Sequence, residues 1–234
     1  MKLVKRLHQK KYRNEYQLFF IEGRKGLEEL IGTHLELVKL FVYREFQDFF
    51  QHLPVEVITP KELKSISALK NPNGLLGVFK ISKPVEINNK GWILVLDDIR
   101  DPGNLGTIIR LCDWFGITDL VCSEATVDVY NPKVIQATMG SMARVNVVYT
   151  SLTDFLKGTE LPIYGGYMDG AVVYDKKLPN AGILVMGNEA NGISPDLGHL
   201  IKNTITIPQY GKSTAESLNV AMATGILLNE IRKG

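Results

Sequence analysis

Short apolar runs alternate along the chain with segments whose apolar residues recur every three to four positions. In the second half, the strand-like runs cover residues 93–96, 120–121, 163–167, 183–186 and 204–207. The helical period predicts one helix capped by Asn104 and a long apolar helix from about Ser217 to Arg232. Buried strands that alternate with helices predict an α/β domain with a parallel sheet.

The first 81 residues repeat the alternation on a smaller scale. Strands are expected at 38–42, 55–58 and 74–81, and helices at 23–31, at 46–50 and from Pro60 after a Thr59 cap. The polar segment SKPVEINNKG (82–91) separates the two patterns. We therefore expect a small N-terminal α/β domain over 1–85 and a larger α/β domain over 91–234.

Composition excludes several classes of protein. Of the 234 residues, 45% are apolar and 22% are charged, which is typical of a globular protein and not of a disordered one. No apolar run approaches the ~20 residues of a membrane span, and the basic N-terminus lacks the apolar segment of a secretory signal. Two cysteines cannot form a disulfide framework, so we expect a cytoplasmic protein. The four histidines lack metal-ligand spacing, so no metal is expected.

The net charge of +2 conceals a difference between the two halves. Residues 1–90 contain 16 basic and 10 acidic side chains, whereas residues 91–234 contain 11 and 15. Lys10, Lys11 and Arg13 belong to a basic segment with Tyr12 and Tyr16 interleaved. Such a segment attracts RNA phosphates and offers rings for stacking, although a solvated terminus is the alternative.

Three polar or glycine-rich loops follow predicted strands of the larger domain. They are DDIRDPGNLG (97–106), GNEANG (187–192) and PQYGKSTAESLN (208–219). Ligands of parallel α/β sheets bind beyond the carboxyl ends of the strands, so these loops are the candidate site. Each polar residue in them also has an ordinary interpretation as a helix cap or a solvated side chain. Neither a Walker loop nor a G-x-G-x-x-G motif is present, which argues against phosphoryl transfer and an ordinary Rossmann dinucleotide site.

The segments 96–117, 183–194 and 205–230 resemble the three ordered motifs of the SpoU (TrmH-like) family. This family comprises RNA 2′-O-ribose methyltransferases of the SPOUT superfamily, which use S-adenosylmethionine. The segment 10–30 is similar to the start of a substrate-binding domain related to ribosomal protein L30e. The resemblance implies a trefoil knot in the C-terminal domain, a homodimer with its active site at or near the interface, and ribosomal RNA as substrate, with tRNA as the alternative.

The resemblance also implies roles for particular residues. The family's polar motif positions correspond to Asn104, Arg110, Glu189, Ser217 and Asn219, which we expect to be catalytic. Its cofactor-binding positions correspond to Met186, Gly187, Ile207 and Leu218. The third loop is about two residues longer than in some members, so its contacts between Tyr210 and Glu216 stay open. Base-nitrogen methylation and a catalytically inactive RNA-binding or ribosome-assembly protein are the competing interpretations.

Overall fold

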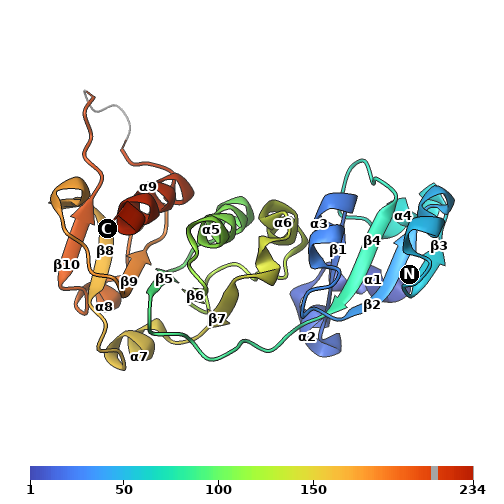
Figure 1. Cartoon of the computed structure of the whole chain (residues 1–234), viewed down its shortest axis with the longest axis horizontal. Coiled ribbons are helices and arrows are strands. Elements are labelled where there is room, and N and C mark those ends of the chain that lie inside the picture. Colours follow the sequence, from blue (N-terminus) through green and yellow to red (C-terminus); the bar gives the residue numbers. More distant parts are fainter. Residues whose placement is uncertain (212–215, 234) are drawn as a thin grey trace. The chain divides into compact units, whose positions relative to one another are not determined.

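The computed structural model describes residues 1–211 and 216–233 and divides the chain into two compact units. Unit 1 comprises Met1–Lys83 with Asp128–Ala143, and unit 2 comprises Pro84–Val127 with Arg144–Gly234 (Figure 1). The segment 128–143 lies between two strands of unit 2 in the sequence but packs within unit 1.

Unit 1 is a four-stranded mixed sheet with helices on both faces. The strand order is β1-β4-β2-β3, with β4 antiparallel to both β1 and β2, and with β2 parallel to β3. The elements are α1 (Lys2–Leu7), α2 (Lys10–Tyr16), β1 (Leu18–Glu22), α3 (Arg24–Leu30), β2 (Leu37–Val42), η1 (Arg44–Phe50), β3 (Val55–Val57), α4 (Pro60–Ile66), β4 (Leu75–Lys80), α6 (Pro132–Thr138) and η2 (Ser141–Ala143).

The core of unit 1 explains these elements. Val4 and Leu7 of α1 and Leu63 of α4 pack with strand residues such as Phe20 on one face of the sheet. On the other face, the Leu27 side chain of α3 covers the sheet at Gly77, where an added Cβ would lie 2.4 Å from it. The predicted helix at Pro60 is confirmed, because Thr59 and Glu62 form a reciprocal capping box.

Unit 2 contains a six-stranded sheet in which every neighbouring pair is parallel. Its strand order is β10-β8-β9-β5-β6-β7. The elements are β5 (Trp92–Leu96), α5 (Pro102–Phe115), β6 (Asp119–Cys122), β7 (Asn146–Tyr149), α7 (Leu152–Lys157), β8 (Ile163–Val172), η3 (Val173–Asp175), β9 (Gly182–Met186), α8 (Pro195–Gly198), β10 (Asn203–Thr206) and α9 (Val220–Lys233). The predicted parallel α/β domain is therefore confirmed.

Helices cover both faces of this sheet (Figure 1). Ile93 and Val95 of β5 point to the face covered by α7 and α8. Helices α5 and α9 pack against each other on the opposite face (Figure 1). Because both faces of the central strands are buried, these strands are continuous apolar runs and not alternating ones.

Both long helices of unit 2 begin at other residues than the sequence predicted. Asn104 was expected to cap the first helix, but the Asp101 carboxylate accepts the hydrogen bond from the Asn104 backbone N–H, and Pro102 is the first helical residue. The last helix was expected from Ser217, but it begins at Val220. Asp before Pro is a strong helix start, so the first shift could have been read from the sequence.

Candidate active site

Three side chains from the three predicted loops form one hydrogen-bonded chain in unit 2. The Asn104 amide nitrogen donates to the Glu189 carboxylate at 2.6 Å. The Asn219 amide nitrogen donates to the Asn104 carbonyl oxygen at 2.9 Å. The structure thus brings together residues that are 85 and 115 positions apart in the sequence.

This chain fixes the orientation of two amide groups. The Asn219 side-chain oxygen accepts the backbone N–H groups of Ala221 and Met222, and so it caps α9. Its amide nitrogen must then face Asn104, and the carbonyl oxygen of Asn104 must face Asn219. Asn104 consequently presents its amide nitrogen to Glu189, and the three loops are held in one arrangement.

The loop that carries Glu189 is folded tightly on itself. Asn188 and Gly192 exchange two backbone hydrogen bonds of 2.9 Å, and the Asn188 side-chain oxygen accepts the backbone N–H of Ala190. A Cβ at Gly187 would lie 2.2 Å from the backbone carbon of Gly192. Only glycine therefore allows this approach at the end of β9.

The loop after β5 is attached to the Glu189 loop through residues that our sequence reasoning did not single out. Asn188 donates to the backbone oxygen of Asp98 at 2.8 Å, and the buried Asp97 carboxylate accepts the backbone N–H of Ser194 at 2.8 Å. Asp98 has a φ of 57°, a left-handed conformation that Asp tolerates better than most residues. The sequence shows both segments, Asp97–Asp98 and Gly187–Glu189, as polar loops. It does not show that they pair, because this depends on β5 and β9 being neighbours in the sheet.

Arg110 and Ser217 are not joined to this chain of hydrogen bonds. Arg110 is exposed on α5, and its guanidinium has no hydrogen-bonding partner among the residues that the structure describes. Six residues separate it from Asn104, which corresponds to about 9 Å along the helix axis. The Ser217 hydroxyl is likewise exposed and lacks a partner in the described part of the chain. Both groups are therefore available to a ligand.

The four predicted cofactor positions lie at strand ends and at the start of α9. Met186 ends β9 and is buried, Gly187 follows it, and Ile207 is half-buried directly after β10. Leu218 is 51% exposed and precedes Asn219. The predicted loop contacts between Tyr210 and Glu216 fall partly on residues 212–215, which lie outside the described residues; Tyr210 and Glu216 themselves are exposed.

Burial shifts the pKa of several side chains in unit 2. Burial, with the carboxylates of Asp169 and Asp97 nearby, raises the pKa of Tyr167. Burial also raises the pKa of the thiols of Cys112 and Cys122, which are free and chemically inert as a result. Across residues 1–211 and 216–233, no three His, Cys, Asp or Glu side chains gather as metal ligands would.

The basic N-terminal segment is folded and not a solvated tail. Lys10 and Lys11 are exposed on α2, and the Lys11 ammonium and the Arg6 guanidinium lie over the Tyr12 ring, 5.8 and 5.4 Å from its centroid. Tyr12 and Tyr16 stack with their ring centroids 6.1 Å apart. This is an exposed surface of cations and aromatic rings.

Arg13 does not belong to this surface, which corrects our prediction that it binds RNA. Its side chain is buried, and its guanidinium donates to Asp128 at 3.1 Å and to the backbone oxygens of Leu7 and His8. The basic run in the sequence cannot distinguish this arginine from its neighbours, because the partner carboxylate is 115 residues away.

A parallel α/β sheet whose loops gather an amide, a carboxylate and a helix cap beyond the strand ends is typical of enzymes that bind nucleotide-like ligands. A search of family models matches residues 91–229 to the SpoU rRNA Methylase family and residues 1–77 to an MRM3-like substrate binding domain. The chain belongs to the SpoU rRNA methylase family.

Relatives cover both units. The chain is 28% identical over 236 residues to the 23S rRNA (guanosine(2553)-2′-O)-methyltransferase RlmP of Bacillus subtilis, which covers 97% of this chain and 94% of the relative. A solved structure from Porphyromonas gingivalis, assigned to the TrmH family of RNA methyltransferases, is 37% identical with a TM-score of 0.89, covering 99% and 96% of the two chains. An rRNA methyltransferase from Sinorhizobium meliloti with bound AdoMet is 28% identical with a TM-score of 0.87, covering 99% and 93%.

Proposed function

We propose that this protein transfers a methyl group from S-adenosylmethionine to a ribose 2′-hydroxyl of ribosomal RNA. The observation that carries the proposal is the chain Asn219–Asn104–Glu189, which joins the three loops of the SpoU motifs. Ribosomal RNA is favoured over tRNA, because a named rRNA 2′-O-methyltransferase aligns with 97% of the chain, including the N-terminal unit.

The cofactor would be held by Met186, Gly187, Ile207 and Leu218, and it would supply an electrophilic methyl group. The residues present fit such a ligand. Leu218 leaves apolar surface open for a flat heterocycle, and the compact turn after Gly187 presents backbone rather than side chains. Gly187 and Leu218 are close to Glu189 and Asn219 in the sequence, so the hydrogen-bonded chain supports a single site for the two proposed cofactor loops.

The chain's own residues orient the ribose hydroxyl, whose proton passes to solvent water as its oxygen takes the methyl group. A guanidinium stays protonated in proteins, so we assign Arg110 to the adjacent phosphate and to the developing alkoxide charge and not to proton abstraction. Ser217 is exposed beside Asn219, and either group can orient the hydroxyl. Asn104 and Glu189 hold the loops in the arrangement that this requires.

Tritium transfer from labelled S-adenosylmethionine to separate pools of ribosomal RNA and tRNA tests this function. We expect labelled 2′-O-methylnucleosides in ribosomal RNA. Label on a base nitrogen would establish the competing base methylation, label in tRNA alone would establish the tRNA alternative, and the absence of label would favour an inactive RNA-binding protein.

We further propose that the protein is a homodimer that pairs through the exposed face of α5 and the start of α9. Trp114 of α5 is 84% exposed and Met222 at the start of α9 is 63% exposed, and large exposed apolar side chains can mark an interaction surface. Arg110 lies four residues before Trp114 on the same face of α5. Pairing through this face would bring Arg110 to the interface, as expected for an active site completed there.

Light scattering after size exclusion tests the dimer. We expect twice the chain mass for the wild type and a monomer for Trp114→Glu, with a loss of methyl transfer. A dimeric Trp114→Glu protein would exclude this face.

In the part of the chain that the structure describes, no helix is both long and apolar enough to cross a bilayer. We assign the protein to the cytoplasm, because its proposed substrate is ribosomal RNA.

A further inference from the structure

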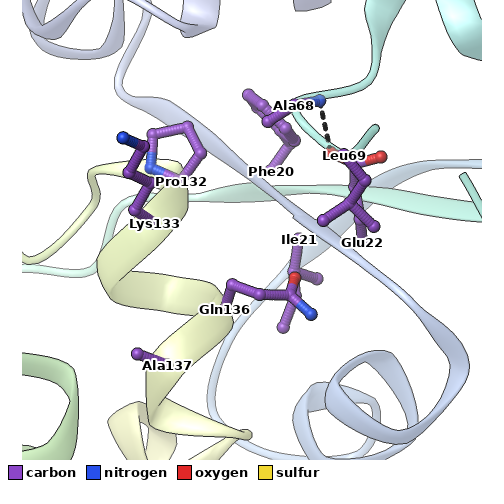
Figure 2. A pocket seen from close by; sticks show the side chains of 9 residues that line it. All are labelled: Phe20, Ile21, Glu22, Ala68, Leu69, Pro132, Lys133, Gln136 and Ala137. Carbon is purple, nitrogen blue, oxygen red and sulfur yellow. Dashed lines mark hydrogen bonds between the residues drawn. The ribbon is translucent and has the colours of Figure 1, made fainter. Parts of the chain in front are cut away.

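A pocket of about 270 Å³ lies in unit 1 along the edge strand β1 (Figure 2). Its walls come from β1, from the segment after α4 and from one side of α6. The lining residues are Phe20, Ile21, Glu22, Ala68, Leu69, Pro132, Lys133, Gln136 and Ala137. A second pocket of about 200 Å³ shares Ile21, Glu22 and Gln136 with it, so the two pockets are neighbours, and together we call them the depression.

The walls and the size suit a small flat ring. Ile21, Leu69, Pro132 and Ala137 are apolar, and the volume lies just below the 300–1,000 Å³ of sites for drug-sized ligands. A single heterocyclic base is of that smaller class. RNA is often recognised through bases that have left the stack and entered such pockets.

The polar groups around the pocket can read the edge of a base. Strand β1 pairs only with β4 among the described strands, so backbone groups on its outer edge are open to a ligand. Gln136 is exposed and offers an amide donor and acceptor. The Glu22 carboxylate is held in place by the Ser67 hydroxyl and by the Ala68 backbone N–H at 2.7 Å. Burial raises the pKa of Glu22, and the hydrogen bonds from Ser67 and Ala68 oppose this shift.

The rim of the depression is basic. Lys133 borders the first pocket, and Arg24 and Lys25 border the second. Glu28 pairs with Arg24 at 2.6 Å, whereas Lys25 and Lys133 form no ion pair with any of the residues that the structure describes. The base of a nucleotide would fit between the apolar walls, and its phosphate would lie outside the pocket beside the ammonium groups. A peptide strand added to β1 would use the same edge but would not need these lysines.

We propose that this depression binds one unpaired nucleobase of the substrate RNA, with Lys133 and Lys25 on the flanking phosphates. This inference rests on the proposed function, because it assumes that the substrate is RNA. It adds a second point of recognition, in unit 1, to the methyl-transfer site in unit 2.

The full-length, isotopically labelled protein tests the pocket by NMR. The probes are the four nucleoside 5′-monophosphates, with ribose 5-phosphate as a matched ligand that lacks the base. We expect at least one monophosphate to shift the backbone amides of Ala68, Lys133, Gln136 and Ala137, with a dissociation constant on the order of 1 mM. Ribose 5-phosphate should leave these amides unchanged. Equal shifts from both kinds of probe, or no shift from either, would overturn the base pocket.

Substitutions connect the pocket with the reaction. Ala137→Leu fills the slot and Gln136→Ala removes its amide, and each should raise the KM for RNA about 5-fold without changing kcat, a factor within the range of one lost contact. Lys61→Ala, an exposed lysine away from the pocket, is the control. An unchanged KM in both variants would overturn the inference while wild-type methyl transfer still supported the proposed function. If the wild type bound the base but transferred no methyl group, the pocket would be supported and the proposed function would be wrong.

Discussion

At the scale of single residues, the family resemblance implied five catalytic side chains, and the structure joins three of them. Asn104, Glu189 and Asn219 form one chain of hydrogen bonds, whereas Arg110 and Ser217 stay outside it. The supporting residues Asp97 and Asn188 were not predicted, because their partners are backbone groups of other loops. A pattern of side chains contains no direct signal for such bonds.

Asn104→Ala tests the central link of the chain. The substitution removes both the hydrogen bond to Glu189 and the bond from Asn219, so we expect kcat to fall on the order of 10²-fold. The melting temperature should change little, because alanine favours the helix that Asn104 occupies. Steady-state kinetics and a thermal melt measure the two effects. Asn180→Ala, an exposed asparagine of the same unit, is the control, and equal kcat in the two variants would contradict the role of Asn104.

Arg110→Lys tests whether the guanidinium acts through its planar fork. A lysine keeps the charge but cannot grip a phosphate through two parallel hydrogen bonds, so we expect at least a ~10-fold lower kcat/KM. Folding stability should be unchanged, because Arg110 contacts no other side chain through a polar bond in the described residues. Nearly full activity at unchanged RNA binding would show that only the charge matters.

At the scale of elements, the apolar runs of the inner strands were predicted well and the helix starts less well. Strands β5 and β9 are buried on both faces, so their sequence signal is strong. The start of α9 was placed three residues early, because Ser217 and Asn219 are both good caps and only the fold decides between them. Helices α1 and α2 were missed, because their basic residues were interpreted only as an RNA-binding segment or a solvated terminus.

Asn219 variants separate its two roles. Asn219→Asp keeps an oxygen that caps α9 but loses the donor to Asn104, so the protein should stay as stable as the wild type and lose activity. Asn219→Ala loses both and should also be destabilised by about 1 kcal/mol. Urea unfolding and methyl transfer distinguish the roles. Full activity in Asn219→Asp would show that the bond to Asn104 is dispensable.

The buried ion pair between Arg13 and Asp128 stabilises the fold and takes no direct part in RNA binding. Arg13→Ala leaves the Asp128 carboxylate without its partner and should cost about 3–5 kcal/mol. Lys10→Ala, three residues earlier on the exposed side of α2, should change stability by less than about 0.5 kcal/mol. Chemical denaturation of both variants measures the difference, and similar stabilities would contradict the buried assignment of Arg13.

At the scale of the whole molecule, the sequence predicted two α/β parts and the sign of charge in each. It did not predict that residues 128–143 would pack with the first unit, since the helix in this segment has the same period whichever sheet it covers. The trefoil knot implied by the family resemblance stays a prediction, because periodicity contains no information about threading.

The excess of basic charge in residues 1–90 predicts a salt dependence of RNA binding. Lys10→Ala and Lys11→Ala should each raise the KM for RNA and reduce the slope of log KM against log salt by about 1, because each lysine releases a counterion from the RNA. Lys61→Ala, at an exposed lysine of α4, is the comparison. Slopes that match the wild type in both variants would exclude α2 from the RNA-binding surface.

The chemical position of the transferred methyl group tests the account most directly. A 2′-O-methylated ribose blocks alkaline cleavage of the adjacent phosphodiester, because the free hydroxyl is the attacking group. Ribosomal RNA treated with the wild-type enzyme and labelled S-adenosylmethionine should therefore release the label in alkali-resistant dinucleotides, and Asn104→Ala should release almost none. Label that appears only in mononucleotides after alkaline hydrolysis, or no transfer by the wild type, would contradict ribose methylation by this site.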